Sequence, residues 1–78
     1  MGTGPLIRSK RLSVGISQTE LAKRLGVSPQ FISNIEREVC ELPAVFYKKT
    51  AKLLQIHKYE FTEVRRKMAE NDVEEAFR

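Results

Sequence analysis

The sequence is poor in cysteine and histidine: Cys40 and His57 are the only residues of their types among 78. A lone cysteine cannot form a disulfide within the chain. No group of residues has metal-ligand spacing, so we expect no metal. No paired nucleophile and base and no phosphate-cradling loop appear, so we expect neither an enzyme nor a cofactor. Stability must therefore come from packed helices, from association with a second copy, or from both.

Long apolar runs and strand patterns are also missing. No run is long enough for a membrane span or a signal peptide, and no stretch alternates apolar and polar residues between turn residues. We therefore expect a cytoplasmic protein without a membrane partner, and the free thiol of Cys40 fits a reducing compartment. The net charge of +4 and the pI of about 9.5 are compatible with a polyanionic partner, but are a weak signal alone.

Apolar residues instead recur at helical spacing, which predicts an all-α protein with five helices. The first helix is expected to bury Leu6, Ile7 and Leu12, and the fourth to bury a broad face that includes Val45 and Phe46. The expected helices run over residues 5–14, 18–25, 29–37, 43–54 and 59–70, with a last short turn or a frayed end after them.

The second and third helices carry the strongest local signals. Ser17 is a good N-cap, and Glu20 completes a capping box with it. Gly26 ends the second helix, and Ser28 followed by Pro29 begins the third. A link of three residues makes the two helices cross steeply. The N-terminal end of the third helix then projects from the surface in a shape that fits the major groove of DNA.

The side chains left outside this core suit contact with DNA. Gln and Asn can pair bidentately with adenine, Ser can bond several base edges, and Pro29 can only touch a thymine methyl group. Free N–H groups at helix starts and basic side chains favour phosphate. The alternative is an ordinary solvated polar face. The candidate base-reading residues are Gln18, Pro29, Gln30, Ser33 and Asn34, and the candidate phosphate contacts are Lys10, Ser17, Lys23, Arg24 and Arg37.

These residues resemble the Cro/C1-type (Xre) family of helix-turn-helix regulators. The matching pattern is Gln-x-x-Leu-Ala from Gln18, Gly-Val-Ser from Gly26, and Ile-Ser-x-Ile-Glu-Arg from Ile32. The resemblance implies one five-helix, lambda-repressor-like domain over residues 1–78, with the helix-turn-helix at 17–37 and a core and dimerisation region at 43–70. It also implies a structural ion pair between Arg11 and Glu36, and a bacterial or phage origin.

The sequence departs from the family pattern after the recognition helix. Glu38 stands where relatives have glycine, and a carboxylate is unfavourable both near DNA and at a helix C-terminus. The loop from Glu38 to Leu42 is about one residue longer than the common pattern, which puts its path over the phosphates in doubt. Phe31 packs on the start of the fourth helix or sits near DNA; the sequence leaves both open.

The second half has more apolar surface than one small core needs, so we expect a homodimer. Its expected interface is Tyr59, Phe61, Val64 and Met68. Two-fold symmetry would then place two recognition helices about one DNA turn apart, roughly 34 Å, on an inverted repeat. The alternative is a monomer whose fifth helix covers its own core.

The sequence thus predicts a regulator of transcription, a repressor, that binds double-stranded DNA and needs no cofactor or small-molecule ligand. Two alternatives stay open. One is an antitoxin that neutralises a toxin through its tail and represses its own operon. The other is a protein-interaction module whose recognition helix no longer reads DNA. Pro29 and Glu38 leave this alternative open, because neither favours contact with DNA. A controller protein of a restriction-modification system is a narrower form of the main prediction.

Overall fold

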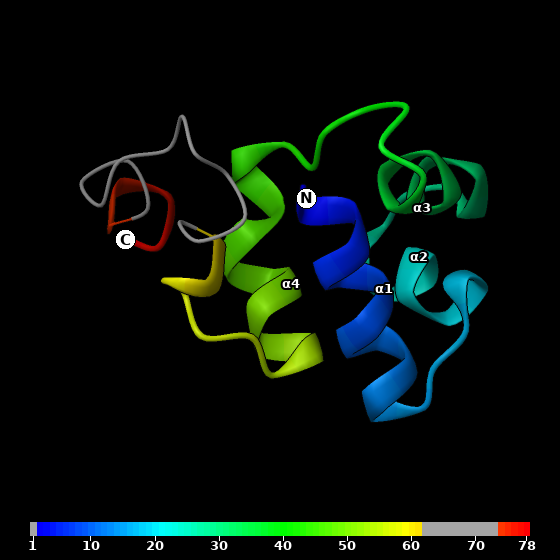
Figure 1. The fold of residues 1–78 in the computed structure, drawn as a ribbon, viewed down its shortest axis with the longest axis horizontal. Coiled ribbons are helices and arrows are strands. Elements are labelled where there is room, and N and C mark those ends of the chain that lie inside the picture. The colour runs from blue at the N-terminus through cyan, green and yellow to red at the C-terminus, as the bar shows by residue number, and fades with distance from the viewer. Residues whose placement is uncertain (1, 62–73) are drawn as a thin grey trace.

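The computed structural model describes residues 2–61 and 74–78, and helices account for the regular structure of that part (Figure 1). No strand occurs among these residues, which confirms the predicted all-α class. Four α-helices and one 3-10 helix follow one another: α1 (Thr3–Val14), α2 (Gln18–Leu25), α3 (Pro29–Glu36), η1 (Ala44–Phe46) and α4 (Tyr47–Leu54). None of the helices in the described part is long and apolar enough to cross a membrane.

Helix α2 begins and ends where the capping residues predict, and α3 begins where they predict but ends at Glu36, one residue before the expected end. The hydroxyl of Ser17 accepts a hydrogen bond from the backbone N–H of Glu20 at 3.0 Å, and Ser28 does the same for Phe31 at 3.1 Å. Gly26 ends α2 in the left-handed conformation, at φ 74°, which a residue without Cβ adopts at low cost. The capping box is only half formed, because the Glu20 carboxylate bonds Arg24 instead.

The hydrophobic core lies between the helix pair α2 and α3 on one side and α4 on the other, with α1 between them (Figure 1). At its α4 end, the rings of Tyr47 and Phe61 stack with their centroids 4.6 Å apart, and both side chains are fully buried. The other apolar residues of this core are Ile7, Leu21, Ala22, Leu25, Ile32, Ile35, Leu42, Ala51, Leu54 and Ile56.

The buried face of helix α1 differs from the predicted one. It begins at Thr3, two residues before the expected start, and Leu12 is 56% exposed. The neighbouring Arg11 is buried in its place. Apolar spacing alone could not predict this, because the burial of Arg11 depends on a carboxylate supplied by α3, 25 residues further along the chain.

The predicted fourth helix is divided. Residues 44–46 form η1 and the α-helix begins only at Tyr47, so Val45 is 84% exposed rather than part of a buried face. Phe46 turns inward and meets Phe31 edge to face, with the ring centroids 6.2 Å apart. Of the two positions left open for Phe31, the structure shows packing beside the start of α4.

The chain turns after α4 and begins another helical segment. Nδ1 of His57 accepts a hydrogen bond from the backbone N–H of Tyr59, and the Glu60 carboxylate accepts one from the backbone N–H of His57 at 2.8 Å. That bond, and then Lys10, lower the pKa of the Glu60 carboxyl. Residues 60 and 61 are helical, and the rest of the predicted helix 59–70 lies outside the described residues. Residues 74–76 form a helical turn.

Candidate DNA-binding surface

Helix α3 presents the candidate reading face. Its buried stripe is Ile32, Ile35 and Glu36, which fixes the opposite side of the helix outward. Pro29 and Gln30 in its first turn are exposed, and Ser33 and Asn34 one turn later are half-buried. The structure therefore brings these four candidate base-reading residues together on one exposed helix, in a shape that a major groove admits.

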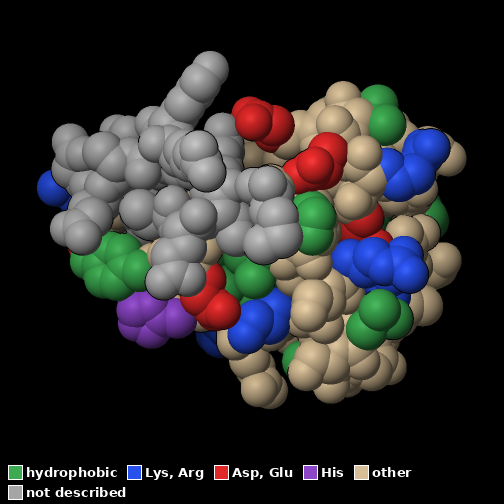
Figure 2. All heavy atoms as spheres, viewed as in Figure 1, with side chains coloured by type: hydrophobic (Ala, Val, Ile, Leu, Met, Phe, Trp, Pro, Cys, Tyr) green, Lys and Arg blue, Asp and Glu red, His purple; other side chains and the backbone are tan. Residues whose placement is uncertain are grey.

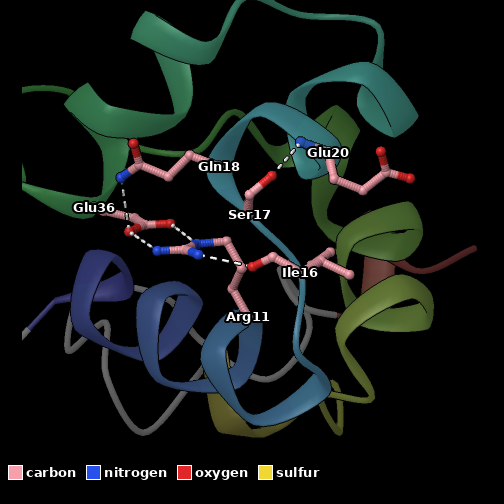
Figure 3. A network of polar contacts seen from close by, with 6 residues as sticks. All are labelled: Arg11, Ile16, Ser17, Gln18, Glu20 and Glu36. Atoms are coloured by element: carbon pink, nitrogen blue, oxygen red, sulfur yellow. Dashed lines mark hydrogen bonds and ion pairs between the residues drawn. The ribbon is translucent and has the colours of Figure 1, made fainter.

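A buried ion pair ties this helix to α1 (Figure 3). Nε of Arg11 donates to Oε2 of Glu36 at 2.7 Å, and Nη2 donates to Oε1 at 3.1 Å. The remaining Nη1 donates to the carbonyl of Ile16 at 2.8 Å, in the turn before α2. The pair implied by the resemblance is thus present, and Arg11 links three segments: α1, the turn and α3.

The same carboxylate holds Gln18, the fifth candidate base-reading residue. Nε2 of Gln18 donates to Oε1 of Glu36 at 3.1 Å, so the side chain reaches from the start of α2 toward the end of α3 (Figure 3). One N–H and the carbonyl oxygen of this amide are left for another partner. Gln18 is therefore fixed in place while it keeps a donor and an acceptor.

A second network lies along the outer face of α3. Oδ1 of Asn34 accepts hydrogen bonds from Nε2 of Gln30 and from Nη2 of Arg37, both at 2.9 Å. The three residues are four and three positions apart, the spacing that places side chains on one helix face. The network could not be predicted from this spacing, because spacing does not show which way an amide points.

The candidate phosphate contacts divide into two groups. Ser17, Lys23, Arg24 and Arg37 are exposed on or beside α2 and α3. Lys10 instead lies on the side of α1 that faces the chain after α4, where its ammonium is 3.2 Å from Oε1 of Glu60. On the face shown in Figure 2, basic and acidic side chains are interspersed and do not form a patch of a single charge.

The position of Glu38 explains how this residue replaces the usual glycine. Its backbone is left-handed at φ 62°, the conformation that a helix end favours for glycine. Its carboxylate folds onto the start of α1, where a Cβ placed on Gly2 would collide with Oε1 of Glu38. A negative charge beside the first turn of a helix is favourable. The carboxylate thus has a favourable neighbour, α1, that the sequence did not reveal.

The fold and this surface together define a DNA-binding helix-turn-helix domain. A model of the family described as Helix-turn-helix matches residues 7–61. The chain therefore belongs to the Cro/C1-type helix-turn-helix family, whose members bind DNA and regulate transcription. No match was found among curated proteins or among solved structures.

Proposed function

We propose that this protein is a sequence-specific repressor that binds an inverted repeat in double-stranded DNA as a homodimer. The observation that carries the proposal is the outer face of α3, where Gln30 and Asn34 present side-chain amides on a helix anchored by Ile32 and Ile35. Amide side chains at the exposed start of a helix suit the edges of bases in the major groove.

The residues around α3 support docking of this helix in the major groove. Ser17 and Ser28 each accept one backbone N–H at the start of α2 and of α3, and the remaining first-turn N–H groups of Gln18 and Gln30 can donate to phosphate oxygens. Lys23 and Arg24 lie exposed in the last turn of α2, and Arg37 caps the end of α3. We propose that these side chains position the domain on the sugar–phosphate backbone, while the amides of Gln18 and Gln30 read sequence.

Of the four residues expected at the dimer interface, Phe61 is enclosed within the protomer. Phe61 is fully buried between Tyr47 and Phe77, so it stabilises the single protomer and has no face left for a partner. Val64 and Met68 lie outside the described residues. Tyr59 is 36% exposed, and its hydroxyl donates to the Glu74 carboxylate of the same protomer. The support for a homodimer is the small size of the domain, since one helix-turn-helix covers only half of a two-fold site.

Selection from a random duplex DNA pool at near-physiological salt tests the proposal. We expect an inverted repeat whose half-site centres are about 10 base pairs apart. Lys52→Ala, at an exposed position of α4, should select the same sequence, whereas simultaneous replacement of Gln18 and Gln30 by alanine should recover no common sequence. Binding by the wild-type protein that is weak, salt-sensitive and without sequence preference would refute the proposal.

A further inference from the structure

The network on α3 fixes the direction of two amides. An arginine side chain has only donors, so the atom of Asn34 that lies 2.9 Å from Nη2 of Arg37 has to be the oxygen. That oxygen can only accept, so the atom that Gln30 turns toward it has to be the nitrogen. Arg37 therefore determines, through Asn34, which end of the Gln30 amide faces away from the network.

This arrangement gives the two amides different hydrogen-bonding capacities. Oδ1 of Asn34 has two lone pairs, and both are occupied, by Gln30 and by Arg37. Asn34 thus has no acceptor to offer the N6 amino group of adenine unless the network breaks. Gln30 keeps its carbonyl oxygen and one N–H, which are the acceptor and donor that pair with N6 and N7 of adenine.

We propose that Gln30 reads an adenine in each half-site and that Asn34 is a positioning residue, which holds the Gln30 amide in the direction that this pairing needs. The proposal rests on the function proposed above. It revises the sequence-based assignment, in which Gln30 and Asn34 each contact a base. The exposure of Gln30 makes the restraint necessary, because a free glutamine side chain would have to be ordered at the moment of binding.

The proposal predicts that the two residues affect one base pair rather than two. In Gln30→Ala, discrimination for adenine over the other bases at a single position should fall on the order of tenfold, the loss of one bidentate pair. In Asn34→Ala, discrimination at that same position should fall, by a smaller factor. The double variant should be no less specific than Gln30→Ala alone, because Asn34 acts only through Gln30.

Asn34→Asp is the rescue variant. Aspartate keeps an oxygen that can accept from Gln30 and Arg37, but it has no N–H to give to a base. It should therefore retain the adenine preference, with an affinity lowered for all sequences alike by the added negative charge. Arg37→Ala tests the same network from its other end, and should relax the preference at the same position.

The experiment measures the affinities of these variants for the selected half-site and for its single-base substitutions, with thermal unfolding as the check that each variant folds. Lys52→Ala is the control and should leave every ratio unchanged. Loss of discrimination at a different base pair in Asn34→Ala, or no rescue by Asn34→Asp, overturns this proposal and leaves the proposed function intact. A wild-type protein without sequence preference overturns both.

Discussion

Two Arg–Glu pairs of this protein have similar N–O distances and opposite surroundings. Arg11 and Glu36 lie 2.7 Å apart with side chains 8% and 2% exposed. Arg24 and Glu20 lie 3.0 Å apart with side chains 48% and 41% exposed. Solvent and ions screen the second pair, so it contributes little to stability. In the first pair, each charge depends on the other, because neither has water to solvate it.

Removing one charge from each pair should separate these two cases. Glu36→Gln leaves the guanidinium of Arg11 buried without its counter-charge, so we expect a loss of about 3–5 kcal/mol in the free energy of unfolding. Glu20→Gln should cost less than about 1 kcal/mol, although it removes the same charge. Urea denaturation of both variants measures the difference. Equal losses would show that the buried pair is no more important to stability than the exposed one.

At the scale of elements, the start of α1 and the end of α3 lie unusually close together. A Cβ on Gly4 would lie 2.5 Å from the carbonyl oxygen of Ile35 and 2.7 Å from that of Glu36. Both atoms belong to the backbone at the end of a helix, so neither can move as a flexible side chain would. The contact also brings the positive end of one helix dipole to the negative end of the other, which is favourable.

Gly4→Ala should therefore destabilise the domain, even though alanine is the better helix former. To remove the overlap, α1 has to shift away from α3, and we expect a net loss of about 1–3 kcal/mol. Ser9→Ala is the control on an exposed position of the same helix, and should change stability by less than about 0.5 kcal/mol. Thermal unfolding monitored by circular dichroism compares them. A Gly4→Ala variant as stable as wild type would mean that the approach is looser than the structure shows.

The elements that the sequence predicted well are those with local signals. Ser28 and Gly26 mark a helix start and a helix end through bonds within a few residues, and both were found where expected. In α1, the position that was predicted wrongly depends on a distant partner: Leu12 is exposed because α1 is oriented with Arg11 toward Glu36 of α3. The direction of the Asn34 amide is likewise set by side-chain geometry, which spacing does not contain.

At the scale of the whole molecule, the last described residues fold back on the protomer. Phe77 packs on Phe61, with the ring centroids 5.9 Å apart. The Glu74 carboxylate accepts hydrogen bonds from the hydroxyl of Tyr59 and the ammonium of Lys58, and these bonds lower the pKa of the Glu74 carboxyl. The C-terminal turn thus covers part of the face that the sequence assigned to a second copy, so a direct test of the dimer is needed.

The spacing between half-sites provides that test, because a dimer places its two recognition helices at a fixed separation. Inserting 5 base pairs between the half-sites turns one of them by about half a helical turn, to the opposite side of the duplex. A homodimer can then engage only one half-site, and the affinity should fall at least about tenfold, since the contacts of a whole recognition helix are lost. Replacing 5 base pairs of the spacer without changing its length is the control and should have a much smaller effect. Fluorescence anisotropy at one salt concentration measures both. If the insertion leaves the affinity unchanged, the protein binds as independent monomers, and Phe61 and Phe77 complete a domain that needs no partner.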